Sequence, residues 1–144
     1  MLLSKTCEYA IRAMIFIAQQ SKKGNRVGKK EIAERIESPE YFMAKILQDL
    51  SRIGFIQSAK GPNGGFFMSG KQMDVSLAEI VREIDGNEIF KGCGLGLKEC
   101  SSEFPCPIHF RFSAVRDELK SMLEESTVIM FVESLDLNLT FLRK

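Results

Sequence analysis

Three of the four cysteines of this chain, and its only histidine, lie between Gly92 and His109. Cys93, Cys100, Cys106 and His109 follow the spacing C-x6-C-x5-C-x2-H, and the surrounding Gly and Pro residues indicate a loop that leads into the start of a helix. Thiolates and an imidazole gathered in one compact loop are typical ligands of Zn²⁺ or of an iron–sulfur cluster. The spacing therefore predicts a metal or cluster site at residues 92–109.

A disulfide framework and a chance grouping of free thiols are the alternatives to a metal site. Disulfides need an oxidising compartment, and three cysteines in one loop leave one without a partner. The N-terminus lacks the layout of a signal peptide, and the apolar run 13–18 is too short to span a membrane. We therefore expect a cytoplasmic protein with no membrane partner, in which clustered cysteines indicate metal binding or redox sensing.

The N-terminal half predicts a DNA-binding domain. Residues 1–70 carry 11 Lys and Arg against 6 Asp and Glu, whereas residues 71–144 carry 9 against 13. Apolar periodicity predicts helices over 4–20, with one buried face, over 29–36 and over 41–53. Ser38 is expected to cap the third helix, Pro39 to occupy its first position and Gly54 to end it. A Pro-Asn-Gly-Gly turn at 62–65 predicts a hairpin over 55–69. Three helices followed by a hairpin are the order of a winged helix-turn-helix, which we assign to residues 1–75.

Residues 76–144 are expected to hold the cysteine loop (92–109) and dimerisation helices. A capping box of Ser76 and Glu79 begins a helix that ends at Gly86, and further helices are predicted over 107–125 and 127–142. The last two are too apolar to stand alone in water. Pairing with a second copy of the chain is the favoured explanation, and folding back onto the same domain is the alternative. The predicted fold is mainly α with a small β-hairpin: a winged helix-turn-helix domain followed by a long C-terminal dimerisation helix.

The chain resembles the Rrf-type winged-helix transcription regulators over nearly its whole length. The resemblance is carried by the opening Tyr9-Ala10-Ile11-Arg12-Ala13, the helix end at 50–55, the wing Lys60-Gly61-Pro62-Asn63-Gly64-Gly65-Phe66 and the three-cysteine loop. The chain departs from the usual pattern in two places: the first gap between cysteines is six residues rather than five, and Lys60 stands where the family often has Arg. Members that bind a cluster carry such a loop, so the resemblance implies a sensor.

The resemblance implies that Cys93, Cys100 and Cys106 bind an iron–sulfur cluster, either [2Fe–2S] or [4Fe–4S]. Two residues are candidates for the fourth ligand: His109, or Glu8 contributed from the first helix across a dimer. A His or carboxylate is a harder ligand for iron than a thiolate, so either gives a labile cluster suited to sensing. Zn²⁺ is the chemical alternative, since the same donors suit it.

The resemblance also implies a double-stranded DNA operator read by a homodimer, with half-sites about one helical turn apart. It places the reading helix at 38–53, with Lys45 contacting guanine or phosphate and Gln48 contacting adenine. The expected DNA-binding residues are Lys29, Lys30, Ser38, Tyr41, Lys45, Gln48, Arg52, Lys60 and Asn63. Cluster binding is expected to order the loop before the dimer helix and so to set the spacing of the two reading helices.

Three functions remain open from the sequence: a cluster-sensing repressor, a winged-helix regulator that uses the cysteines for zinc or as a thiol redox switch, and a cluster carrier or scaffold that does not bind DNA. The basic half and the wing favour the first two. An enzyme is not expected, because the one His lies among the cysteines and no nucleophile–base pair or phosphate loop is present. No small-molecule substrate is expected either.

Overall fold

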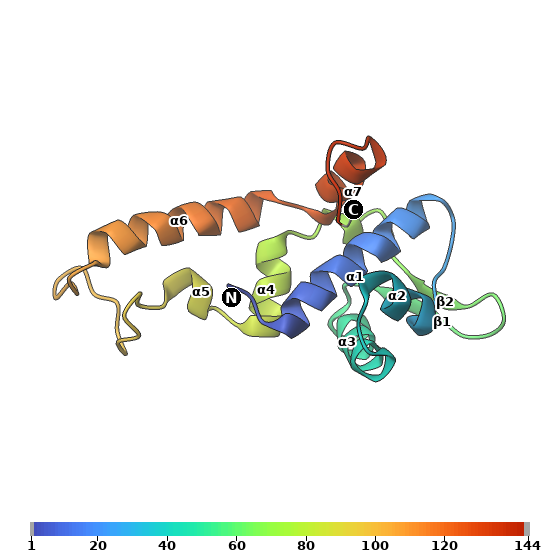
Figure 1. Ribbon diagram of the computed structural model, residues 1–144, viewed down its shortest axis with the longest axis horizontal. Coiled ribbons are helices and arrows are strands. Elements are labelled where there is room, and N and C mark those ends of the chain that lie inside the picture. The colour runs from blue at the N-terminus through green and yellow to red at the C-terminus, as the bar shows by residue number, and fades with distance from the viewer. Residues whose placement is uncertain (1, 143–144) are drawn as a thin grey trace.

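The computed structural model describes residues 2–142, which are mainly helical with one small hairpin, as the sequence predicts. In chain order the elements are α1 (Lys5–Lys22), α2 (Lys29–Ile36), α3 (Glu40–Ile53), β1 (Gln57–Ala59), β2 (Gly65–Phe67), the 3₁₀ helix η1 (Gln72–Asp74), α4 (Leu77–Asp85), α5 (Glu88–Lys91), α6 (His109–Glu125) and α7 (Val128–Asp136). Figure 1 shows a body around α1 and an arm formed by α6, with the cysteine loop at the far end of the arm. No helix of residues 2–142 is long and apolar enough to cross a membrane.

Helix α1 is the centre of the body. Ser4 caps it, because the backbone N–H of Cys7 donates to Ser4 Oγ at 3.0 Å. Residues 13–18 are all buried, so this part of the helix is covered on more than the one face that the sequence predicts. The reason is that α2, α3, α4 and α7 all pack against α1 (Figure 1).

Helices α2 and α3 form the helix-turn-helix, with one correction at the turn. Glu37 is left-handed (φ 61°), and the backbone N–H of Ser38 donates to the carbonyl of Ala33 at 3.0 Å, which closes the end of α2. Pro39 is the N-cap of α3 instead of its first residue, and Ser38 Oγ is buried with no hydrogen-bond partner in the described part of the chain. The predicted Ser38 cap is therefore wrong, because Ser38 belongs to the end of α2.

The wing is the predicted hairpin, extended by one bridge from the body. Strands β1 and β2 pair antiparallel with Ser58 opposite Phe66. Val27 adds an outer edge, donating to Phe66 O at 3.1 Å and accepting from Phe66 N–H at 2.7 Å. At Gly65 (φ 134°) a Cβ atom would lie 2.8 Å from the carbonyl oxygen of Val27, so only glycine permits this close approach.

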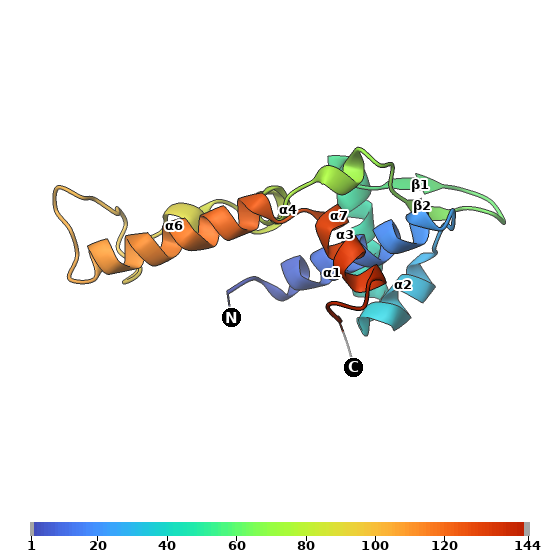
Figure 2. The ribbon, with the colours of Figure 1, turned by 90° about the horizontal axis from the view of Figure 1, so that it is seen from above.

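Helices α4 and α5 join the body to α6, the helix of the arm. The predicted capping box begins α4: Ser76 N–H donates to Glu79 Oε2 at 2.8 Å, and Glu79 N–H donates to Ser76 Oγ at 3.2 Å. Helix α6 packs on α4 and on the short helix α5, which the sequence analysis did not predict. Its other face is left open, and the arm extends well away from the body (Figure 2).

Helix α7 folds back onto the body of its own chain, which was the alternative to pairing with a second copy. Val128 N–H donates to the carbonyl of Val75 at 3.1 Å, and Val128 and Val132 are fully buried in the common core. Gln19 and Lys22 of α1 contact Asp136 at 3.3 Å and 3.5 Å. Val128 and Val132 therefore pack within their own chain, which is the fold-back alternative, whereas Met130 of the same helix stays 51% exposed.

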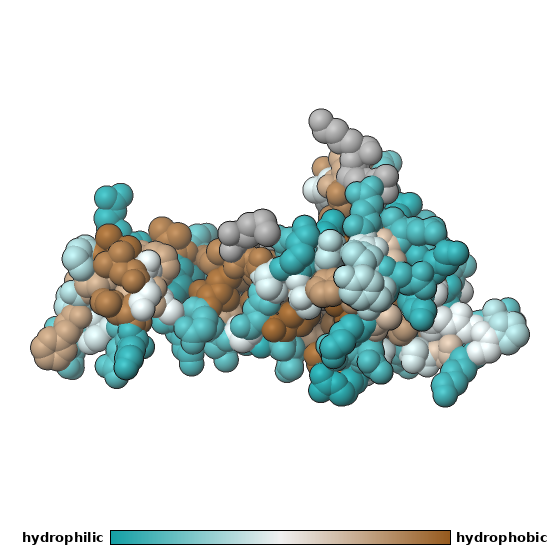
Figure 3. Space-filling model, turned by 60° about the horizontal axis from the view of Figure 1, so that its bottom comes forward, coloured by the Kyte–Doolittle hydropathy of each residue, from teal (hydrophilic) through white to brown (hydrophobic). Residues whose placement is uncertain are grey.

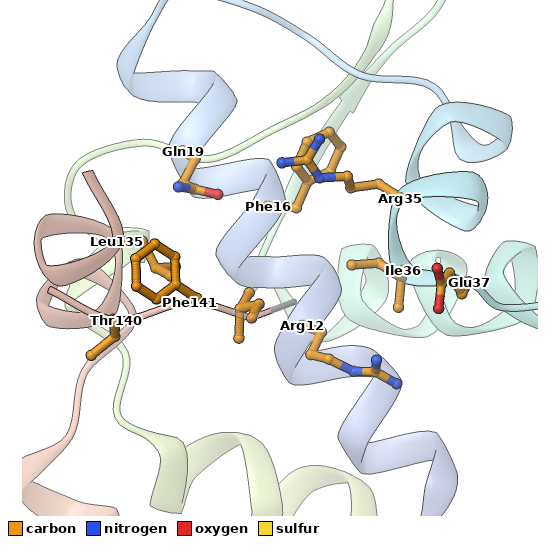
Figure 4. A pocket seen from close by; sticks show the side chains of 10 residues that line it. Arg12, Phe16, Gln19, Arg35, Ile36, Glu37, Leu135, Thr140 and Phe141 are labelled. Atoms are coloured by element: carbon orange, nitrogen blue, oxygen red, sulfur yellow. The ribbon is translucent and has the colours of Figure 1, made fainter. Parts of the chain in front are cut away.

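A hollow of 230 Å³ separates the C-terminal segment from α1 and the end of α2 (Figure 4). Arg12, Phe16 and Gln19 line it from α1, and Leu135 and Phe141 line it from the other side. None of the lining residues belongs to α3, to the wing or to the cysteine loop.

Candidate DNA-binding surface and cysteine centre

One face of α3 is exposed to solvent. The helix buries Met43, Ile46, Leu47 and Leu50 and exposes the stripe Tyr41, Lys45, Gln48 and Arg52. The phenol of Tyr41 stands 80% exposed, which is unusual for so large a ring and leaves it free for an external contact. Four of the predicted DNA-binding residues thus share one side of the second helix of the helix-turn-helix.

The wing continues this face. A shallow groove runs between α3 and the hairpin, and its lining residues are Lys29, Tyr41, Ala44, Lys45, Gln48, Ser51, Ser58 and Phe66. Lys30, at the start of α2, and Lys60 and Asn63, in the wing, are exposed but do not line this groove. Ser38 is the exception among the predicted contacts, because it is half-buried and its hydroxyl oxygen is covered.

Asp49 pairs with two of the cations on this surface. Its Oδ1 lies 3.8 Å from Lys45 Nζ and 3.4 Å from Arg52 Nη2, and both basic side chains are 73% exposed. Exposed pairs of this kind contribute little to stability, so exchange of a carboxylate partner for a DNA phosphate costs little.

Arg26 is a further basic residue of this region, and no sequence motif indicates it. Its guanidinium lies over the ring of Phe67, 4.6 Å from the centroid. The Val27–Phe66 bridge brings Arg26 to the base of the wing, on the same side as Asn63. Arg26 lies in a polar connection between two helices, and nothing in the neighbouring sequence indicates that this connection contacts the wing.

The cysteine loop brings its four predicted ligands together as two pairs. Cys93 Sγ and Cys106 Sγ lie 4.0 Å apart, and Cys100 Sγ lies 3.3 Å from His109 Nδ1. All four cysteines of the chain are free. In the part of the chain that the structure describes, no group of three or more His, Cys, Asp or Glu converges closely enough to hold a single metal ion.

Helix α6 and the loop backbone fix these side chains. His109 is the first residue of α6 and is buried, so it is not the exposed surface histidine that would argue against a ligand role. The pKa of the Cys93 thiol is lowered, chiefly by the backbone N–H of Leu95, which donates to Cys93 Sγ at 3.4 Å, and by that of Leu97. Such N–H donors favour a thiolate, the form that binds metal.

Glu8, the other candidate for the fourth ligand, lies on α1. Its carboxylate is partly exposed and pairs with Lys5 at 3.6 Å. The two ligand pairs of the loop do not include it. A role for Glu8 therefore stays a prediction that requires a second subunit.

Cys7 differs from the loop cysteines in chemistry. Burial, with smaller contributions from Asp85 and Glu8, raises the pKa of its thiol to about 12. Because almost no thiolate forms at neutral pH, we predict that iodoacetamide at pH 8 alkylates the three loop cysteines of the metal-free native protein and spares Cys7. Mass spectrometry of native and urea-unfolded samples checks this. Rapid labelling of Cys7 in the native protein would contradict its burial.

The open face of α6 and the loop around the cysteines are apolar. Val115 and Met122, seven residues apart and so on one face of the helix, are 65% and 51% exposed, and Phe110, on another side of its first turn, is 65% exposed. Leu95, Leu97 and Phe104 add exposed apolar area on the loop. Figure 3 shows hydrophobic surface gathered over the arm, whereas the body is mostly hydrophilic on that view. An exposed apolar area of this kind indicates a contact with another protein.

The helix-turn-helix, the wing and the basic stripe on α3 define a winged-helix DNA-binding protein. The family model described as "Rrf2: Iron-dependent Transcriptional regulator" matches residues 3–134. The chain therefore belongs to the Rrf2 family of transcriptional regulators, which confirms the resemblance seen in the sequence. The family is one of regulators rather than enzymes, and this membership argues against the carrier or scaffold function.

Relatives and solved structures agree with this assignment. An HTH-type transcriptional regulator of Aquifex aeolicus is 26% identical, with 89% of each chain covered. The regulator NsrR of Geobacillus kaustophilus is 25% identical, with 92% of this chain and 90% of the relative covered. The fold is similar to those of CymR, the global cysteine regulator of B. subtilis (TM-score 0.73, 20% identity, 91% and 95% covered), and of T. potens IscR (TM-score 0.72, 20% identity, 98% and 93% covered).

Proposed function

We propose that this regulator binds its DNA operator under the control of an iron–sulfur cluster held by Cys93, Cys100, Cys106 and His109. The observation that carries the proposal is the pairing of these four side chains in one loop at the start of α6. Such a cluster supplies a group that oxidants, nitric oxide or iron shortage can change. Glu8 of a second subunit is the alternative fourth ligand.

The donor geometry favours two irons over one metal ion. Two thiolates on one tetrahedral metal, with bonds of about 2.3 Å, lie about 3.8 Å apart, close to the 4.0 Å between Cys93 and Cys106. A [2Fe–2S] cluster takes two protein ligands on each iron, and His together with Cys is a known ligand set. Two separate donor pairs match that requirement, whereas zinc needs four donors around one point.

The place of the loop supports control of DNA binding. It joins the α4–α5 side of the chain to α6, and the open apolar face of α6 is the surface we assign to a homodimer. An ordered loop fixes α6 relative to α4, and α4 packs on α1 in the body. The state of the loop thus sets how far apart the two copies of α3 lie on DNA.

Anaerobic purification followed by an absorption spectrum tests the cofactor. We expect visible charge-transfer bands and equal amounts of iron and acid-labile sulfide, about two of each per chain for a [2Fe–2S] cluster. A colourless protein that contains zinc, or that takes up no iron and sulfide on reconstitution, would contradict the proposal.

Lys45 tests the DNA surface. We predict that Lys45→Ala weakens operator binding and reduces the slope of log affinity against log salt by about one, because one phosphate contact is lost. Lys120→Ala removes the same charge from the exposed side of α6 and should change neither quantity. Fluorescence anisotropy at several salt concentrations gives both values. Equal slopes for Lys45→Ala and wild type would mean that Lys45 does not contact a DNA phosphate.

A thiol switch is the second candidate, and the Cys93–Cys106 distance favours it. Their Sγ atoms lie 4.0 Å apart, and a movement of about 2 Å would bring them to disulfide length. Oxidation of the metal-free protein with diamide, followed by peptide mapping, detects this bond. If a Cys93–Cys106 disulfide forms and alters operator affinity in a protein that never takes up a cluster, the switch replaces the cluster as the sensor.

A further inference from the structure

Arg116 reaches from α6 to two points of the cysteine loop. Its Nη1 donates to the carbonyl oxygen of Gly92 at 3.0 Å and to Cys100 Sγ at 3.2 Å. Gly92 directly precedes Cys93, so one guanidinium holds both the beginning and the middle of the loop against the helix. No motif in the sequence singles out this residue.

Cys100 lies between two side chains of the same helix. His109 and Arg116 are seven residues apart, which is about two helical turns, so they project from the same face of α6. Cys100 Sγ contacts His109 Nδ1 at 3.3 Å as well as Arg116 Nη1. By contrast, Cys93 and Cys106 contact each other, and Cys93 Sγ also accepts from the backbone N–H of Leu95. The Cys100–His109 pair is thus the half of the centre that is attached to α6.

The Arg116 side chain also has an unused donor. Its Nε is buried and has no hydrogen-bond partner among the described residues. A buried N–H without an acceptor is costly and is rare in folded proteins, whereas a hydrogen bond from a guanidinium to an anion is among the strong ones. An anionic group in the loop would supply the missing acceptor beside the existing contact with Cys100.

We propose that Arg116 is a positioning residue that fastens the cysteine loop to α6 and raises the reduction potential of the cluster in that loop; this rests on the proposed cluster. When the cluster accepts one electron it gains one negative charge. A guanidinium against a ligand sulfur stabilises the reduced cluster more than the oxidised one, because hydrogen bonds and nearby charge set such potentials. Through its contacts with Gly92 and Cys100, Arg116 also couples the order of the loop to the position of α6.

Two measurements on Arg116→Gln, Arg116→Lys and the control Arg111→Gln test the proposal. Arg111 is exposed on the same helix, so the control removes the same charge from the arm. The first measurement is amide hydrogen exchange of residues 92–109 in the metal-free protein. The second is the midpoint potential of the loaded protein, titrated with dithionite through dye mediators, in which one electron passes from dithionite to each cluster.

We expect faster amide hydrogen exchange of the loop in Arg116→Gln and a lower midpoint potential. Unchanged exchange in α3 would show that the body is still folded. Arg116→Lys should recover most of the potential but not the loop protection, since one ammonium lacks the planar fork and reach of the guanidinium. Arg111→Gln should match wild type in both. Unchanged loop exchange in Arg116→Gln overturns the anchor, and an unchanged potential, or an equal shift in Arg111→Gln, overturns the charge contact. If wild type takes up no cluster, the proposed function fails and the potential part with it, while the exchange measurement still decides the anchor.

Discussion

Cys106→Ala is expected to abolish cluster binding. Cys106 is one half of the pair with Cys93, whose sulfurs lie 4.0 Å apart, and its removal leaves one iron with a single protein ligand. Loss of residues that merely support metal ligands costs about 10–100-fold in affinity, and loss of a ligand itself should cost at least as much. The protein purified without oxygen should therefore lack the visible bands and hold almost no iron or sulfide.

Cys7→Ala is the matched control for this prediction. It removes the same chemical group from a buried position in α1 outside the loop, so iron and sulfide should stay at the wild-type level. His109→Ala and Glu8→Ala identify the fourth ligand: the first should give a labile cluster, and the second should leave it intact. Full iron and sulfide in Cys106→Ala would place the cluster outside the loop and contradict the proposed site.

Val115→Asp is expected to dissociate the homodimer and therefore to weaken operator binding. Val115 is 65% exposed on the open apolar face of α6, and a carboxylate there would be buried without a partner in a dimer. Two linked DNA-binding domains bind with an avidity about 10²–10⁴-fold above that of one domain. Loss of the dimer should therefore lower operator affinity by about a hundredfold or more. Light scattering after gel filtration gives the mass, and anisotropy gives the affinity.

The control for Val115→Asp places the same carboxylate on the polar side of the helix. Lys120→Asp changes the net charge by more than Val115→Asp does, yet it should remain dimeric because that side carries charged residues. Circular dichroism should show both variants folded, since neither position lies in the core of the body. A dimeric Val115→Asp protein would mean that the two copies meet through another surface.

The DNA-binding half could be predicted because its signals are local. The bounds of α2 coincide with the predicted range 29–36, and Gly54 ends α3 in a left-handed conformation (φ 99°) as expected. The Pro-Asn-Gly part of the predicted turn lies between the two strands of the wing, and Gly65 begins β2. Helical periodicity, a C-terminal glycine and a tight turn each act within a few residues, so one sequence is enough to recognise them.

What the sequence could not predict depends on contacts between distant residues. The apolar spacing of Val128 and Val132 requires burial but does not say whether α1 or a second subunit provides it. Ser38 has the residue type of an N-cap, but its backbone is already used to close α2. Arg26 and Arg116 acquire their contacts only through the Val27–Phe66 bridge and through the return of the loop to α6.

The pairing of the site residues also depends on tertiary structure. The sequence places three cysteines and a histidine in one loop but gives no reason why Cys93 should face Cys106, or why Cys100 should face His109. That arrangement follows from a loop that begins after α5 and ends at the first turn of α6, with Gly92 and Cys100 held by the same side chain.

The central claim is that the state of the cluster controls DNA binding. It is tested most directly by the operator affinity of one anaerobic preparation, measured by anisotropy before and after removal of the cluster with a chelator. The duplex can be selected from random sequences, and the salt concentration must be equal in both titrations. We predict that the two affinities differ by about 5–150-fold, the range of a coupling free energy of about 1–3 kcal/mol. Equal affinities for the two forms would contradict the account.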